Sequence, residues 1–310
     1  MLKSFVFLAL NSLIVCVMTA LRKEYQRIAG ANLKSTVFFM LINGVIGCII
    51  GLAYCFFTNF ALVKGIDGKV FALATAFAII LTLNTIVCIY GAKYGSVAIF
   101  SVFATMGTLV ISSAYGLIFA PEKNKLDLFS VLGIIIVILV VALNFVNTKT
   151  VEVKTSKKDA FIYKILCIVV FFTNGSALPV YSMFTSNCLD YGQLNYIFLY
   201  LFLTFIICMV LYSIISLVTK NKQNQVKDNA YLSKKPFLCS VIYGVVLIAS
   251  EFFGLTVTTL LPIVIQAPLS FAMVVVLVAI VDYFVYKVKP TKIQIGQMIL
   301  AVISAVLFAL

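Results

Sequence analysis

One glutamate, Glu251, lies inside the apolar run VVLIASEFFGLTVTT at residues 245–259. A charged carboxylate near the centre of a bilayer costs at least about 2.5 to 3.5 kcal/mol, so acids at this depth usually face the interior of a helix bundle and mark a path for substrate or protons. Glu251 lies about three residues beyond the middle of its run, which at about 1.5 Å per residue leaves it close to the midplane. We predict that it binds a proton or a cationic group. The alternative is a protonated carboxyl group that bonds a neighbouring helix.

Neutral polar side chains inside the other apolar runs are candidates for hydrogen bonds around such a substrate. Asn84 is the one strongly polar residue in the core of AFAIILTLNTIVCIY, and hydroxyl side chains recur at helical spacing from Ser101 to Ser112. Each of these groups could equally bond a neighbouring helix. With Glu251, the predicted substrate-binding or proton-binding residues are Asn84, Asn11, Asn174, Gln266, Ser101, Thr105, Tyr181 and Ser270.

The elements that must position these residues are apolar runs of membrane-spanning length. The chain has 310 residues, of which 63% are hydrophobic and 11% charged, with a mean hydropathy of +1.16. Runs of about 17 to 25 apolar residues can each cross roughly 30 Å of hydrocarbon as a helix. The sequence therefore predicts an all-α integral membrane protein with ten transmembrane helices. The runs are 4–20, 36–58, 69–91, 96–119, 127–146, 162–184, 193–218, 237–259, 262–286 and 292–310.

A polar segment at 147–161 divides the chain into two halves of five runs each, 1–146 and 162–310. Sliding the second half onto the first by 167 positions places Glu251 opposite Asn84, and an offset of 163 pairs Asn174 with Asn11. Because each half has an odd number of spans, the halves would enter the membrane in opposite orientations. Inverted repeats of this kind are typical of secondary transporters, whose substrate site lies between the repeats.

Lysines and arginines gather in alternate connections between the runs. The odd-numbered connections hold 17 of them, Arg22 and Arg27 included, whereas the N-terminus and the even-numbered connections hold five, and Lys164 lies near a helix end. The positive-inside rule then predicts that both termini face outward. This bias accounts for the net charge of +13, so we expect no nucleic-acid partner. No Lys or Arg is expected inside the apolar helices.

Glycines and cysteines in the apolar runs are interpreted structurally. Gly44, Gly47 and Gly51 in NGVIGCIIG predict a close-packing face. The eight cysteines are scattered without a CxxC pair and the chain has no histidine, so the sequence predicts no metal site and no cofactor.

Two long segments resemble a known family. KYGSVAIFSVFATMGTLVISSAYGLIFAPEK at 93–123 and LPIVIQAPLSFAMVVVLVAIVDYFVYKVKPTKIQIGQMI at 261–299, together with the five-helix halves, resemble the drug/metabolite transporter superfamily, in particular its EamA-like ten-helix members. The second segment departs from the family pattern, since Lys287 to Pro290 stand where an acid is usual. The resemblance implies export of metabolites, amino acids or toxic compounds. It also implies cytoplasmic termini, which conflicts with the distribution of lysine and arginine.

These observations predict a secondary active transporter that works by alternating access and exports a small metabolite, with Glu251 binding either a proton or a cationic group of the substrate. The chain carries no GxxxxGK[ST] loop, so an ion or substrate gradient would supply the energy. Its expected location is the cell membrane, which it would cross many times. The alternatives are a polytopic intramembrane enzyme acting on a lipid-linked substrate, which would need a catalytic constellation that is missing, a passive channel, and a nucleotide-sugar-type exchanger. The last would need a buried Lys or Arg for its anionic cargo.

Overall fold

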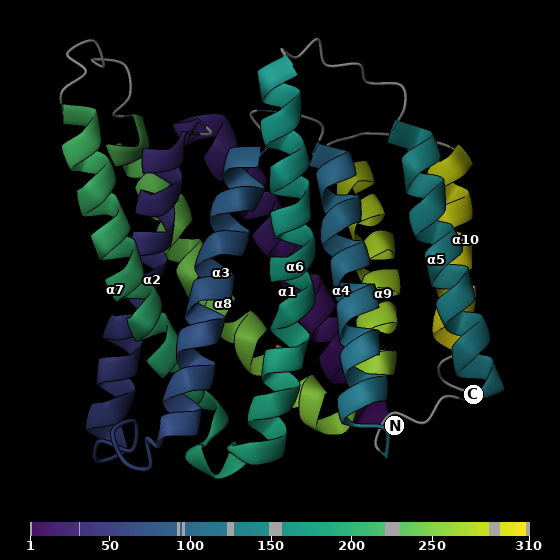
Figure 1. Cartoon of the computed structure of the whole chain (residues 1–310), viewed down its shortest axis with the longest axis horizontal. Coiled ribbons are helices and arrows are strands. Elements are labelled where there is room, and N and C mark those ends of the chain that lie inside the picture. Colours follow the sequence, from purple (N-terminus) through teal and green to yellow (C-terminus); the bar gives the residue numbers. More distant parts are fainter. Residues whose placement is uncertain are drawn as a thin grey trace. The chain divides into compact units, whose positions relative to one another are not determined.

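The computed structural model describes residues 2–30, 32–91, 94, 97–122, 127–148, 157–220, 230–284 and 292–307. These residues form ten α-helices and two short 3-10 helices, and no β-strand occurs among them (Figure 1). The α-helices are α1 Leu2–Ala29, α2 Leu33–Phe57, α3 Gly68–Gly91, α4 Val97–Phe119, α5 Leu128–Thr148, α6 Lys157–Asn187, α7 Gln193–Lys220, α8 Lys234–Leu260, α9 Ile263–Phe284 and α10 Lys292–Leu307. The 3-10 helices are η1 Leu189–Tyr191 and η2 Ala230–Leu232.

Polar residues directly before the apolar runs determine where three helices begin. The side-chain oxygens of Asn32, Asp67 and Asp127 accept hydrogen bonds from the backbone amides three residues later, at 2.6, 2.7 and 2.7 Å. Each bond satisfies one of the amides that the first turn of a helix leaves without a partner. The starts of α2, α3 and α5 therefore follow from local sequence.

Six of the helices are long and apolar enough to cross a membrane, judged by length and composition. They include α2, with a mean hydropathy of 2.2 in its most apolar window, and α7, with 2.7. In α4, α5, α9 and α10 the described apolar stretches are shorter. The all-helical fold and six apolar helices of membrane-spanning length are thus confirmed, while ten membrane crossings remain a prediction.

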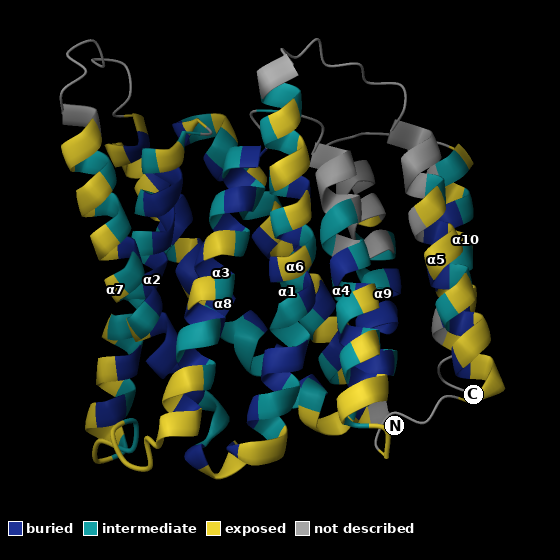
Figure 2. Cartoon of the chain, in the orientation of Figure 1, coloured by how far each residue is buried: buried dark blue, intermediate teal, exposed yellow. Residues whose placement is uncertain are grey.

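Large apolar side chains cover the exposed faces of several helices along their length. On α7 these include Ile206, Val210, Ile214 and Leu217, which are 42 to 70% exposed. Figure 2 shows the exposed residues of α5 and α7 distributed along both helices rather than only at their ends. A continuous apolar surface of this extent is unfavourable in water and matches lipid.

The helices belong to two compact units that differ from the two halves predicted from sequence. Unit 1 is formed by Met1–Cys16, Tyr94–Ser182 and Phe253–Leu310, and unit 2 by Val17–Lys93 and Met183–Phe252. Each unit combines segments from both halves, and α1, α6 and α8 contribute to both units.

In unit 2, α2 packs closely against α7 through its glycines (Figure 1). A Cβ atom added at Gly44 would lie 2.8 Å from the Cα of Phe205, and one at Gly47 would lie 2.7 Å from the Cβ of Leu201. The predicted close-packing face is confirmed. Residue numbers increase along α2 while those of the contacting residues on α7 decrease, from Phe205 to Leu201. The two helices therefore run antiparallel.

In unit 1, α5 packs against α10 in the same antiparallel sense (Figure 1). The side chain of Gln297 donates to the carbonyl oxygen of Val140 at 3.1 Å, and Ser304 donates to that of Gly133 at 3.2 Å. The apolar core beside these bonds is built from Leu8, Leu109, Val137, Val257 and Leu269.

The cap of α5 predicts a contribution to stability that depends on pH. The hydroxyl and backbone amide of Ser130 donate to the carboxylate of Asp127 and hold its pKa below the ordinary value. A carboxyl group whose pKa is lowered by folding stabilises the protein above its unfolded pKa, about 3.9, and this contribution is lost as the pH falls through the folded pKa.

We therefore expect Asp127→Asn, which keeps a capping oxygen, to reduce the loss of thermal stability below about pH 4 that the wild type shows. Melting temperatures in detergent between neutral and acidic pH test this expectation. Identical pH profiles for the two proteins would contradict it.

Candidate functional site

Helix α1 continues well beyond the apolar run predicted from sequence. That run ends at residue 20, yet α1 reaches Ala29, and the backbone leaves the helix only at Gly30, whose φ of 78° suits glycine. Arg22 therefore lies on the helix rather than in a connection, and its side chain is half-buried. We expected no buried Lys or Arg, and at Arg22 the structure instead places a half-buried basic side chain within a helix. The apolar run was ended before Arg22 because hydropathy treats every basic residue as solvated. It does not register that a neighbouring helix covers the side chain of Arg22.

The covering residue is Tyr243 of α8. The Nε of Arg22 donates to the Tyr243 hydroxyl at 2.7 Å, and the guanidinium carbon lies 5.3 Å from the centre of the tyrosine ring. Tyr243 is fully buried, and its ring packs against Phe39 of α2 with the centroids 4.7 Å apart. A hydrogen bond and a cation–π contact to one immobilised side chain together orient the guanidinium group.

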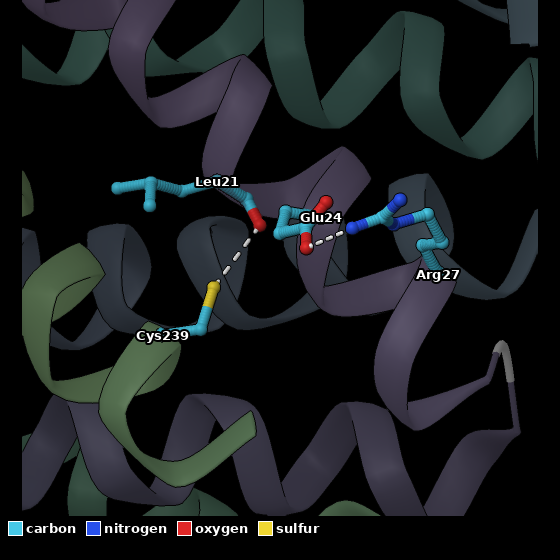
Figure 3. Close-up of polar contacts among 4 residues, drawn as sticks. All are labelled: Leu21, Glu24, Arg27 and Cys239. Carbon is cyan, nitrogen blue, oxygen red and sulfur yellow. Dashed lines mark hydrogen bonds and ion pairs between the residues drawn. The ribbon is translucent and has the colours of Figure 1, made fainter. Parts of the chain in front are cut away.

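The neighbours of Arg22 on α1 are bound to other partners (Figure 3). Glu24, the acid nearest to Arg22 in sequence, forms an ion pair with Arg27. A carboxylate oxygen of Glu24 and a guanidinium nitrogen of Arg27 lie 2.6 Å apart. The thiol of Cys239 on α8 donates to the carbonyl oxygen of Leu21 at 3.4 Å. This contact joins α8 to α1 one residue before Arg22.

Glu251 lies on α8, eight residues beyond Tyr243. At about 1.5 Å per residue this separates their backbones by about 12 Å. Its side chain is half-buried and interacts electrostatically with the guanidinium group of Arg22. No ion pair joins them, although the structure describes both side chains. Unit 2 thus holds an acidic and a basic side chain near each other without direct contact.

Asn84 of α3 reaches the same surroundings through Cys88. The thiol of Cys88 donates to the side-chain oxygen of Asn84 at 3.8 Å, and Cys88 lies near the guanidinium group of Arg22. Arg22 therefore lies near Glu251 and near Cys88, the hydrogen-bond partner of Asn84. Asn84 and Glu251 are the two residues that occupy matching positions when the halves are aligned with an offset of 167. Sequence reasoning missed Arg22. Two signals could have found it, namely the absence of a helix breaker before Gly30 and the presence of only two arginines among 23 basic residues.

In unit 1, Asn174 joins two helices. Its side-chain amide, on α6, donates to the carbonyl oxygen of Ala104 at 2.9 Å and to the hydroxyl of Thr108 at 2.7 Å, both on α4. Ser112 of α4 donates to the carbonyl oxygen of Gly175 at 3.4 Å. These bonds match the alternative in which the polar residues connect helices.

Asn11 and Tyr181 of unit 1 lie against Gly254 of α8. A Cβ atom added at Gly254 would lie 3.8 Å from the side-chain nitrogen of Asn11 and 3.5 Å from the ring of Tyr181. Their roles in binding stay predictions.

The remaining predicted site residues lie on α4 and α9. Gln266 is buried, and its side-chain oxygen accepts no hydrogen bond from the residues that the structure describes, whereas Ser270 is half-buried. The side chains of Ser101 and Thr105 lie outside the described residues.

The site contains no residue set that would suit a metal. All eight cysteines are free thiols, and no group of three or more metal-binding side chains occurs in the part of the chain that the structure describes. The chemistry available in unit 2 is electrostatic binding by Arg22 and Glu251 and hydrogen bonding by neutral groups.

Comparison with known proteins identifies a shared fold and no family. No family model matches the chain, and no curated protein matches it. A solved structure described only as "Crystal structure of protein" is similar to it with a TM-score of 0.68 and 13% sequence identity, over 97% of this chain and 94% of the other. At this identity the similarity shows the fold alone.

Proposed function

We propose that this chain is a secondary active transporter of a small metabolite, an EamA-like member of the drug/metabolite transporter superfamily that works by alternating access in the cell membrane. The observation that carries the proposal is the placement of two ionisable side chains, the basic Arg22 and the acidic Glu251, inside the apolar helices of unit 2. Charged residues inside membrane helices are costly and typically mark substrate or ion paths. Glu251 would bind a proton or a cationic group of the substrate, and export is the proposed direction.

The helix pairs within each unit support two inverted five-helix repeats. Helix α2 contacts α7 in unit 2, and α5 contacts α10 in unit 1, so both pairs combine helices five places apart in the chain. Both pairs are antiparallel, as their close contacts show. Equivalent helices of two inverted repeats must run in opposite directions, so this arrangement is the one that the proposal requires.

Transport of a substrate into sealed vesicles tests the proposal. The purified chain in proteoliposomes should exchange a radiolabelled metabolite at a rate that saturates with concentration. The panel should include amino acids, amines, organic acids and phosphate esters. Flux that rises linearly without saturation would indicate a channel instead. Turnover of a lipid-linked substrate without any exchange would indicate an enzyme.

A further inference from the structure

We infer that Arg22 binds an anionic group of the transported compound, a carboxylate or a phosphate. This inference rests on the proposed function, because it assigns a substrate class to the same site. Arginine is suited to the task because its planar guanidinium presents fixed N–H groups that bind two oxygens of a carboxylate or phosphate at once. The site therefore differs from one that receives neutral or purely cationic compounds.

The first argument is that the guanidinium of Arg22 is held in a binding-competent orientation. The hydroxyl of Tyr243 accepts the Nε hydrogen bond at 2.7 Å, and the guanidinium carbon lies over the tyrosine ring at 5.3 Å from its centre. Tyr243 is itself fully buried against Phe39. These contacts use the Nε edge, and within the described part of the chain no hydrogen bond occupies the terminal N–H groups. An arginine fixed in this way loses little conformational entropy when an anion binds.

The second argument is that no acidic side chain among the residues that the structure describes forms an ion pair with Arg22. A buried charge without a paired opposite charge is strongly destabilising, so natural sites that keep one usually provide a partner. Glu24 pairs with Arg27 instead, and Tyr243 is neutral. Glu251 attracts Arg22 electrostatically but forms no ion pair with it, although both side chains are described. A bound anion would complete the charge pairing of the guanidinium.

The third argument is that Glu251 makes the site selective. When ionised, its carboxylate repels a simple anion that approaches Arg22. Removal of the carboxylate charge would remove this repulsion. A compound that also carries a cationic group, or arrives with a proton for Glu251, avoids this repulsion. Arg22 and Glu251 together therefore favour a substrate with both an anionic and a cationic or protonated end.

Arginine-selective labelling tests this inference directly because Arg22 and Arg27 are the only arginines in the chain. In the Arg27→Lys protein, Arg22 is the sole arginine that phenylglyoxal can modify, and its adduct is identified by mass spectrometry. The purified full-length variant in detergent would be labelled in the presence of inorganic phosphate, acetate or benzoate. Because occupancy lowers the free site by the factor 1 + [L]/Kd, labelling should slow about elevenfold at about ten times the Kd of a binding anion.

The probes separate the possible anion sources. Protection by phosphate alone assigns a phosphate-bearing substrate, and protection by acetate or benzoate alone assigns a carboxylate. In the Arg27→Lys, Glu251→Gln double variant, each protecting anion should act at a lower concentration. An unchanged rate with all three anions, or an Arg22 that reacts only after denaturation, would overturn the inference.

Two further variants guard against misfolding and misassignment. The Arg22→Lys, Arg27→Lys protein should take up no label while keeping its charge and its elution volume on size exclusion. Tyr243→Phe on the Arg27→Lys background removes the acceptor of the Nε hydrogen but retains the ring, so anion protection should need a higher concentration. Labelling requires no transport, so failure of anion protection and failure of the proposed transport can be told apart.

Discussion

Replacement of Glu251 by glutamine is expected to lower the rate of substrate exchange about tenfold to hundredfold. The amide keeps the shape of the side chain but removes the charge, and hydrogen bonds to charged groups contribute about 1.5 to 3 kcal/mol, where each 1.4 kcal/mol corresponds to about tenfold. The substitution removes a half-buried carboxyl group, and with it both the electrostatic interaction with Arg22 and the ability to carry a proton. Initial exchange rates in proteoliposomes, normalised to the amount of protein reconstituted, measure the effect.

The matched control for this change is Asp190→Asn. Asp190 is an exposed acid in η1, between α6 and α7, and the same loss of charge there should leave transport unchanged. Normal exchange by Glu251→Gln would show that the carboxyl group is a helix-packing residue. The site would then have to be sought along α4 and α9.

Replacement of Gly107 by alanine is expected to destabilise unit 1 by about 3 kcal/mol or more, at the upper end of the range for overpacked cores. The added Cβ would overlap the carbonyl oxygen of Phe171 on α6 and lie 2.7 Å from its carbonyl carbon. Backbone atoms cannot rotate away as a side chain can, so the two helices would have to separate. Separation would also break the bonds that Asn174 makes to α4. Melting temperature and the yield of monodisperse protein in detergent measure the loss.

Gly296→Ala provides the comparison. A Cβ atom at Gly296 on α10 would meet no atom within 4 Å. There the change should stabilise the helix by about 0.5 to 1 kcal/mol, because alanine loses less backbone entropy than glycine on folding. Equal melting temperatures for the two variants would show that the α4–α6 contact can open without cost.

The sequence alone was sufficient for the number and order of the helices that the structure describes, although not for the end of α1. Apolar runs of spanning length predicted the helices, because hydropathy and length are properties of contiguous residues. Asn32, Asp67 and Asp127 mark helix starts because a cap is made within four residues. Gly44 and Gly47 could be recognised as packing positions for the same reason, since a helix places residues at regular spacing on one face.

Only the tertiary structure decided which polar side chains share surroundings. Arg22 looked like a loop residue until α8 was seen to cover it with Tyr243, more than two hundred positions away. For Asn174 the sequence left a binding role and a helix-bonding role open, and only the structure shows that its amide is bonded to α4. Burial and hydrogen bonding depend on which helix packs against which, and such contacts join residues too far apart in the chain for periodicity or spacing to reveal them.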